Sequence, residues 1–120
     1  MVLVDTSVWI NHFRKVSPNL IILLEDGEVG CHAFIIGELA CGKLKNRQQI
    51  ITLLQALPQT QILELDEYLH FIEYHDLTGK GIGFVDIHLL ASAQLTGVPL
   101  WSTDRKLVAI AQELHLAYLA

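Results

Sequence analysis

Four acidic side chains stand where the local sequence pattern makes a carboxylate unfavourable: Asp5, Glu38, Asp86 and Asp104. Two of them follow a short apolar segment, and the other two lie within apolar helical patterns. An unpaired carboxylate on a buried surface costs several kcal/mol unless a cation or hydrogen-bond donors compensate it. Carboxylate oxygens gathered around a gap suit a hard divalent ion, Mg²⁺ or Mn²⁺, which keeps several waters. A shared metal ion would explain all four positions together.

Asp86 is the most informative of the four, because its helical neighbours are apolar. Leu89, Leu90 and Ala93 follow it by three, four and seven residues, which places them on the same helical face. A position near the helix N-terminus offsets only about 0.3–1 kcal/mol of the cost of burying the charge. Glu38 lies in a helix that is expected to be buried nearly all round. The alternatives are an acid in an exposed first turn for Asp86 and a solvent-facing side chain for Glu38.

The elements that must hold these side chains alternate between strands and helices. Strands are expected at residues 2–4, 29–32, 61–65, 99–102 and 116–119. Helices are expected between them, the most apolar at residues 84–96, between a glycine-rich loop and Gly97. The expected helix N-caps are Thr6 or Ser7, Asn46 and Asp66, and Asp104 is expected to open the helix after the fourth strand. This alternation predicts one domain, residues 1–120, with a parallel sheet covered on both faces.

Asp5 and Asp104 each follow a predicted strand and precede a predicted helix. The carboxyl ends of parallel strands meet at one edge of an α/β sheet, where such folds bind their ligands. The two side chains can therefore meet if their strands are neighbours. The alternative is that each is an ordinary helix N-cap.

The composition describes a folded, apolar chain with an acidic balance. Apolar residues make up 52% and charged residues 18% of the 120 residues, which argues against disorder and suggests that a partner covers some apolar surface. That partner is a second copy or a different protein. The net charge of −5 argues against tight, unassisted binding of nucleic acid, although carboxylates that hold divalent cations can face phosphate.

Several features are typical of a cytoplasmic protein. Cys31 and Cys41 are expected to be small, reduced, buried thiols. A strand that begins at the first residues leaves no room for a signal peptide, and the longest apolar runs, such as residues 20–24, are too short to span a bilayer.

Four segments carry a resemblance to a known family: residues 4–10 (VDTSVWI), the helix with Glu38, residues 81–93 (GIGFVDIHLLASA) and residues 100–104 (LWSTD). With these segments in this order, the chain resembles a PIN domain, and more narrowly a VapC-type toxin of a bacterial toxin–antitoxin pair. The resemblance implies a Rossmann-like α/β/α sandwich with a four- to five-stranded parallel sheet. It also implies a Mg²⁺- or Mn²⁺-dependent endoribonuclease, a homodimer and a cognate antitoxin that blocks the site.

Carried over by position, the resemblance implies metal-binding, catalytic acids at Asp5, Glu38, Asp86 and Asp104. It implies that the hydroxyl groups of Thr6 or Ser7, and of Ser102, orient these carboxylates. Family members often have a further Asp two residues after the fourth acid, but Lys106 stands there in this chain. Arg105 and Lys106 are expected to contact RNA phosphates, the alternative being a solvated helix start.

The chemistry implied is hydrolysis of an RNA phosphodiester bond that leaves a 5′-phosphate and a 3′-hydroxyl. Glu38 or Asp104 would accept the proton of the attacking water. Other functions are open: a nuclease of RNA maturation, a non-catalytic PIN-like module that binds proteins, and a phosphoacceptor signalling domain. The last would need two acids after the first strand, whereas this chain has Asp5 alone there.

Overall fold

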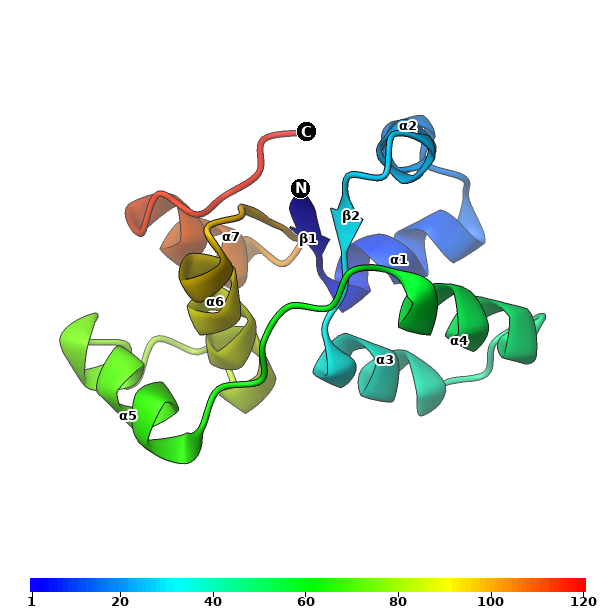
Figure 1. The fold of residues 1–120 in the computed structure, drawn as a ribbon. Helices are drawn as coiled ribbons and strands as arrows, with labels where there is room; N and C mark the ends of the chain where they lie inside the picture. Colours follow the sequence, from blue (N-terminus) through cyan, green and yellow to red (C-terminus); the bar gives the residue numbers. More distant parts are fainter.

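A computed structural model describes residues 1–120 and contains a three-stranded parallel sheet in the order β2–β1–β3. Strand β1 (Val2–Val4) is central, with Val2 opposite Val29 of β2 (Val29–Gly30) and Leu3 opposite Leu100 of β3 (Leu100–Trp101). The helices are α1 (Thr6–Arg14), α2 (Pro18–Glu25), α3 (Ala33–Ala40), α4 (Arg47–Ala56), α5 (Leu65–Tyr74), α6 (Phe84–Thr96) and α7 (Arg105–Glu113). In Figure 1, α1 to α4 lie on one side of β1 and α5 to α7 on the other.

Local sequence signals set several helix ends. Ser17 caps α2, because its hydroxyl oxygen accepts a hydrogen bond from the Leu20 N–H, and Pro18 occupies the first helical position. Gly97 ends α6 in the left-handed conformation, with φ of 78°, which favours glycine. The expected range of α6, residues 84–96, is confirmed. No helix of the chain combines the length and the apolar character that crossing a bilayer requires.

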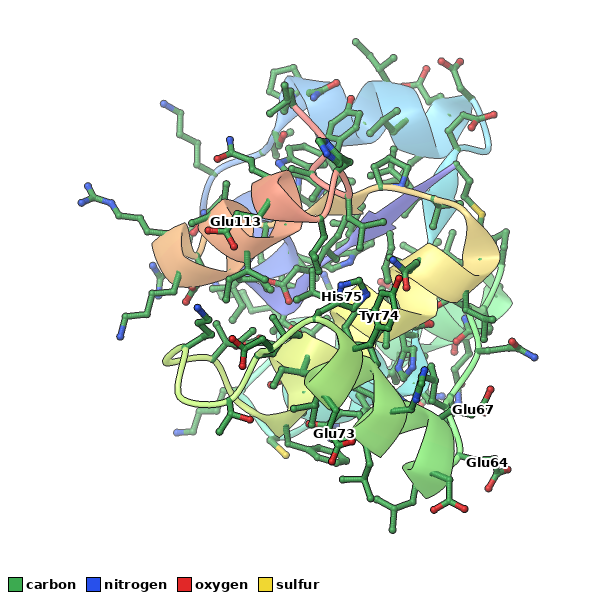
Figure 2. The ribbon with its side chains drawn as sticks, turned by 90° about the vertical axis from the view of Figure 1, so that its left-hand side faces the viewer. Glu64, Glu67, Glu73, Tyr74, His75 and Glu113 are labelled. Atoms are coloured by element: carbon green, nitrogen blue, oxygen red, sulfur yellow. The ribbon has the colours of Figure 1, made fainter.

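Helix α5 forms the outer edge of the molecule and contacts α6. Its polar face carries Glu64, Glu67 and Glu73, all exposed to solvent (Figure 2). Glu64 is the N-cap of α5, in a capping box with Glu67. The expectation that Asp66 caps this helix is wrong, because the capping box starts the helix two residues earlier.

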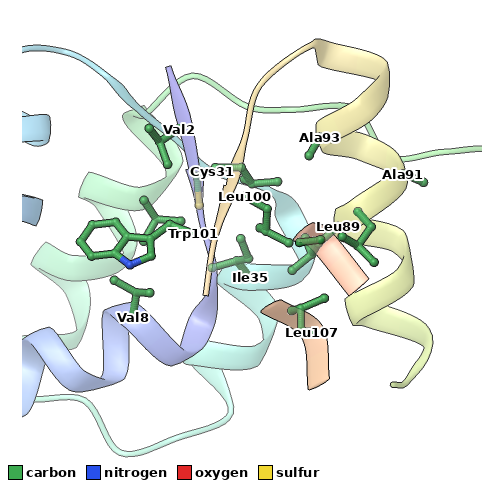
Figure 3. Close-up of a cluster of buried hydrophobic side chains, with 14 of the residues drawn as sticks. Val2, Val8, Cys31, Ile35, Leu89, Ala91, Ala93, Leu100, Trp101 and Leu107 are labelled. Atoms are coloured by element: carbon green, nitrogen blue, oxygen red, sulfur yellow. The ribbon is translucent and has the colours of Figure 1, made fainter. Parts of the chain in front are cut away.

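The core is one cluster of buried apolar side chains between the sheet and the helices (Figure 3). Leu3, Leu89 and Leu107 are fully buried within it. Residues 87–93 of α6 are all buried, so this helix is covered on every side over two turns. A helix placed so deeply holds the first-turn residue Asp86 in a fixed position relative to the sheet.

Two predicted strands are not formed, and the sheet therefore has three strands rather than four or five. Residues 61–65 leave the sheet after a single bridge between Gln59 and Cys31. The Gln61 carbonyl oxygen accepts hydrogen bonds from His32 Nε2 (3.1 Å) and Ser92 Oγ (2.7 Å). Side chains thus satisfy backbone groups that a neighbouring strand would otherwise pair.

Residues 116–119 also form a single bridge, between Ala117 and Leu100. The Leu100 N–H donates to the Leu116 carbonyl, and the Tyr118 N–H donates to the Leu100 carbonyl. Strand β3 is only two residues long, and the Trp101 carbonyl accepts from the Asp5 N–H on the opposite side. Only Leu100 of β3 therefore pairs with residues 116–119, and a single paired residue does not make these residues a strand.

Candidate active site

Asp5 lies directly after β1 and is the N-cap of α1, so the expectation that Thr6 or Ser7 caps this helix is wrong. The Asp5 side chain is 5% exposed and does not cap the helix. Its Oδ2 accepts hydrogen bonds from the hydroxyls of Ser7 and Ser102, each at 2.8 Å. Ser7 belongs to α1 and Ser102 follows β3, so two segments distant in the sequence orient one carboxylate.

The serine hydroxyls are fully used in this arrangement. Ser7 Oγ accepts from the Thr103 N–H (3.0 Å), and Ser102 Oγ accepts from the Asp104 N–H (3.1 Å). Each hydroxyl has one proton, and both protons point to Asp5. Asp5 Oδ1 has no hydrogen-bond partner and reaches solvent. The carboxylate is therefore held by one oxygen and presents the other.

Asp86 lies in the first turn of α6 and is half-buried. Burial raises the pKa of its carboxyl group above the usual value, and the charge of Asp5 raises it further. Asp104 and Glu38 add smaller effects in the same direction, and a backbone hydrogen bond from Gly83 partly opposes them. The four predicted acids therefore share one electrostatic environment, in which negative charge is crowded.

Glu38 and Asp104 are the exposed members of this group. Glu38 Oε1 accepts a hydrogen bond of 2.7 Å from the Thr6 hydroxyl, and Asp104 Oδ1 accepts one of 3.0 Å from the Leu107 N–H. Asp104 opens α7 as expected and is its N-cap, the role that the sequence offered as the alternative for this residue. The expectation that the Glu38 helix is buried nearly all round is wrong: only Ile35 and Leu39 of α3 are buried, because one face alone packs on the core.

The donor chemistry fits a hard divalent ion better than it fits any other metal. No three His, Cys, Asp or Glu side chains converge closely enough to form a ready-made cage. Mg²⁺ does not need such a cage, because it usually takes one or two carboxylates and keeps several waters. The free oxygen of Asp5 and the crowded carboxyl group of Asp86 suit direct ligation, while Glu38 and Asp104 are exposed to solvent. All available donors are oxygen atoms, which favours Mg²⁺ or Mn²⁺.

Lys106 borders the acidic group next to the loop that leads into α6. Gly81 in this loop has φ of 79°, and a Cβ atom added there would lie 3.0 Å from Lys106 Nζ. The lysine side chain therefore passes directly over the loop backbone. The one ion pair in the chain joins the N-terminal ammonium to Glu28, at 2.7 Å. Lys106 and its exposed neighbour Arg105 are thus free to meet an anionic ligand.

Two histidines to which the sequence assigned no function organise the segment behind the site. His32 caps α3, since its Nδ1 accepts from the Phe34 N–H at 2.9 Å, and its Nε2 donates to the Gln61 carbonyl. His88 Nε2 accepts from the Leu63 N–H at 2.9 Å. The two buried rings lie 5.4 Å apart. These hydrogen bonds join residues far apart in the sequence, so no periodic pattern of residues predicts them. Only the fold shows that His32 and His88 hold the backbone of residues 61–63.

Cys31 and Cys41 are both free thiols. Cys31 is buried as expected, and burial raises the pKa of its thiol to about 11. Cys41 is exposed, contrary to expectation. It is the C-cap residue of α3 and does not lie on the face of this helix that packs on the core.

Comparisons with known proteins agree with this site and fold. The family model of the PIN domain matches residues 2–113. Ribonuclease VapC32 of Mycobacterium tuberculosis, in strains CDC 1551 / Oshkosh and ATCC 25618 / H37Rv, is 43% identical over 118 residues, which are 98% of this chain and 95% of that protein. The chain therefore belongs to the PIN domain family and, within it, to the VapC-type proteins.

A solved structure supports the fold independently. The crystal structure of PAE2754 from Pyrobaculum aerophilum matches with a TM-score of 0.68 at 16% identity, covering 98% of this chain and 87% of that chain. At this identity the likeness concerns the fold alone. The predicted α/β class with a parallel sheet is confirmed.

Proposed function

We propose that this protein is a Mg²⁺- or Mn²⁺-dependent endoribonuclease and the toxin of a toxin–antitoxin pair. The main support is the group formed by Asp5, Asp86, Asp104 and Glu38, in which charge is crowded at the carboxyl ends of β1 and β3. The relationship to ribonuclease VapC32 supports RNA as the substrate. The runner-up functions are RNA maturation by the same chemistry and a non-catalytic module that binds proteins.

In the proposed mechanism, Asp5 and Asp86 would hold the divalent ion, and the hydrogen bonds from Ser7 and Ser102 would fix the orientation of the Asp5 carboxylate. The bound ion supplies Lewis acidity toward the phosphate and lowers the pKa of a bound water. Glu38 and Asp104, the exposed acids, are the candidates to accept the proton of the attacking water.

Arg105 and Lys106 are proposed to position the substrate by contacting phosphate oxygens beside the acids. Both lie at the start of α7, next to Asp104. The scissile phosphate would thus meet metal-binding carboxylates on one side and free cations on another.

The divalent ion is the first requirement to test. Wild-type protein is incubated with a 5′-labelled single-stranded RNA in Mg²⁺, in Mn²⁺ and in EDTA, and the product ends are identified by phosphatase treatment and ligation. We expect cleavage only with a divalent ion, leaving a 5′-phosphate and a 3′-hydroxyl. Equal cleavage in EDTA, or products with a cyclic phosphate, would contradict the proposal. A folded protein that neither cuts RNA nor binds Mn²⁺ in calorimetry would favour the protein-binding module.

The hydrogen bond from Ser102 to Asp5 predicts that loss of this hydroxyl weakens metal binding, whereas loss of the neighbouring Thr103 hydroxyl does not. Ser102→Ala removes one of the two hydroxyls that orient this carboxylate, so we expect about 10–100-fold weaker Mn²⁺ binding or slower RNA cleavage. Thr103→Ala is the control, because the Thr103 side chain contacts Asn11 and not Asp5. Calorimetry and initial cleavage rates measure both effects. Equal behaviour of the two variants would show that Ser102 has no orienting role.

A protein partner is proposed in addition to RNA. Large apolar side chains remain exposed on several helices, among them Ile22 of α2, Leu65 and Tyr74 of α5 and Leu95 of α6, between 52% and 76% exposed. We propose that an antitoxin and a second copy of the single domain cover such surface in the cytoplasm. Light scattering would give the oligomeric state, and arrested growth of a bacterium that expresses the chain alone would distinguish a toxin from a maturation enzyme.

A further inference from the structure

The molecule has two large hollows, and their charges differ. The first, of about 710 Å³, lies between α5 and α6 and is lined by Asp66, Glu67 and two histidines. Acidic side chains Glu64 and Glu73 stand on the same helix (Figure 2), and residues 64–76 contain no Lys or Arg. A polyanion would be repelled from this side of the molecule.

The second hollow, of about 630 Å³, has the opposite character. It lies between α1 and the connection from α3 to α4, and its walls include Arg14, Lys43 and Lys45. All three side chains are exposed, and none forms an ion pair. Their charges are therefore available to an anionic ligand.

Arg47, from the same connection, differs from these three residues because its charged group is hydrogen-bonded within the protein. Its guanidinium donates to the carbonyl oxygens of Ala40 (2.7 Å) and Gly42 (3.2 Å), so it closes the end of α3. Lys43 and Lys45 have no such internal partner. In this connection Arg47 therefore has a structural role, whereas Lys43 and Lys45 line the second hollow, called the groove below, with their charges free.

The groove also has an apolar wall. Ile10 and Phe13 of α1 line it and are 40% and 37% exposed. Apolar and aromatic surface beside free cations suits single-stranded nucleic acid, whose bases stack on aromatic rings while its phosphates meet the cations. Duplex would not expose its bases to such a wall.

The groove is continuous with the proposed active site through Glu38, which lines the groove and belongs to the acidic group. The Thr6 hydroxyl, at the other end of α1, holds Glu38 in this shared position. A strand lying in the groove would therefore lead directly to the carboxylates.

We propose that this groove, lined by Ile10, Phe13, Arg14, Lys43 and Lys45, binds the single-stranded RNA segment on one side of the scissile phosphate. The inference rests on the proposed function, since it assigns a substrate path to the same site. Arg105 and Lys106 would hold the strand on the other side of the acids.

The Asp86→Asn protein, which is expected not to cleave RNA, allows binding to be measured alone. Fluorescence anisotropy gives its affinity for a fluorescein-labelled single-stranded RNA over a range of NaCl concentrations. Arg14→Gln/Lys43→Gln/Lys45→Gln in this background should bind roughly 100-fold more weakly at 0.1 M salt, and the slope of log K against log salt should fall by about 2. Lys15→Gln is the matched control, because this exposed neighbour of Arg14 does not line the groove. It should leave both quantities unchanged. Phe13→Ser should weaken binding by about 5-fold or more.

Two outcomes would overturn the path while leaving the proposed function intact. One is a triple variant that binds RNA with the affinity and salt slope of its parent while the wild type still cleaves RNA. The other is a triple variant that loses only the binding of a protein partner, which would make the groove a protein interface. If the triple variant does not fold, judged by circular dichroism, the single variants Lys43→Gln and Arg14→Gln replace it, each with a slope change of about 0.7. Absence of RNA cleavage by folded wild-type protein would refute the proposed function itself.

Discussion

The Asp86→Asn protein is expected to cleave RNA at least about 10³-fold more slowly than the wild type, with its fold intact. The substitution keeps the shape of the side chain and removes the charge that would hold the divalent ion. Cleavage rates in Mg²⁺, with circular dichroism as the check on folding, measure the effect. Glu73→Gln removes an exposed charge on α5 that does not act on Asp86, and this variant should be fully active. A fully active Asp86→Asn protein would remove Asp86 from the site.

The same variant should be more stable than the wild type in EDTA at neutral pH. Burial, and then the charge of Asp5, raise the pKa of Asp86, so the folded state holds this proton more readily than the unfolded chain. The contribution of Asp86 to wild-type stability therefore falls as the pH rises above the ordinary Asp value of 3.8, and the variant lacks this dependence. The difference should vanish at low pH and shrink when Mg²⁺ is added. Thermal melts from pH 4 to 8 would show it.

The second large effect concerns His32 and acid. Burial lowers the pKa of His32 to about 4, and the nearby His88 acts in the same direction, while the Gln61 carbonyl opposes both. The hydrogen bonds explain why the neutral ring is required: Nδ1 accepts from the Phe34 N–H and so has no room for a second proton. An unfolded chain would protonate this ring near pH 6.5. The contribution of His32 to stability is therefore fully present above about pH 6.5 and is lost progressively as the pH falls toward 4.

Urea unfolding at several pH values measures this loss, which we expect to reach about 3 kcal/mol. In His32→Asn the asparagine oxygen can still cap α3, but the titratable ring is gone. The variant should start less stable at pH 7, because the bond to Gln61 is lost, and show a flatter decline between pH 6.5 and 4. His70→Asn, at an exposed position on α5, should keep the wild-type slope. Identical slopes for His32→Asn and the wild type would show that another group causes the acid sensitivity.

The amino-acid sequence by itself determined the features that depend on near neighbours. The apolar run that ends in Asp5 predicted β1, and the apolar stretch before Gly97 predicted α6 over its full length. The capping role of Asp104 was also predictable, because a cap bond spans only three residues. The misfit of a carboxylate among Leu89, Leu90 and Ala93 was enough to single out Asp86, because all four residues share one helical face.

The tertiary structure decided the features that depend on partners far along the chain. Residues 61–65 have the composition of a strand, but His32, His88 and Ser92 satisfy their backbone groups and end the sheet there. Glu38 faces solvent yet remains part of the acidic group, because the Thr6 hydroxyl, 32 residues away, holds it. The two serines on Asp5 are 95 residues apart. The family resemblance implied the roles of Ser7, Ser102 and Glu38, but which atoms meet depends on how the whole chain packs.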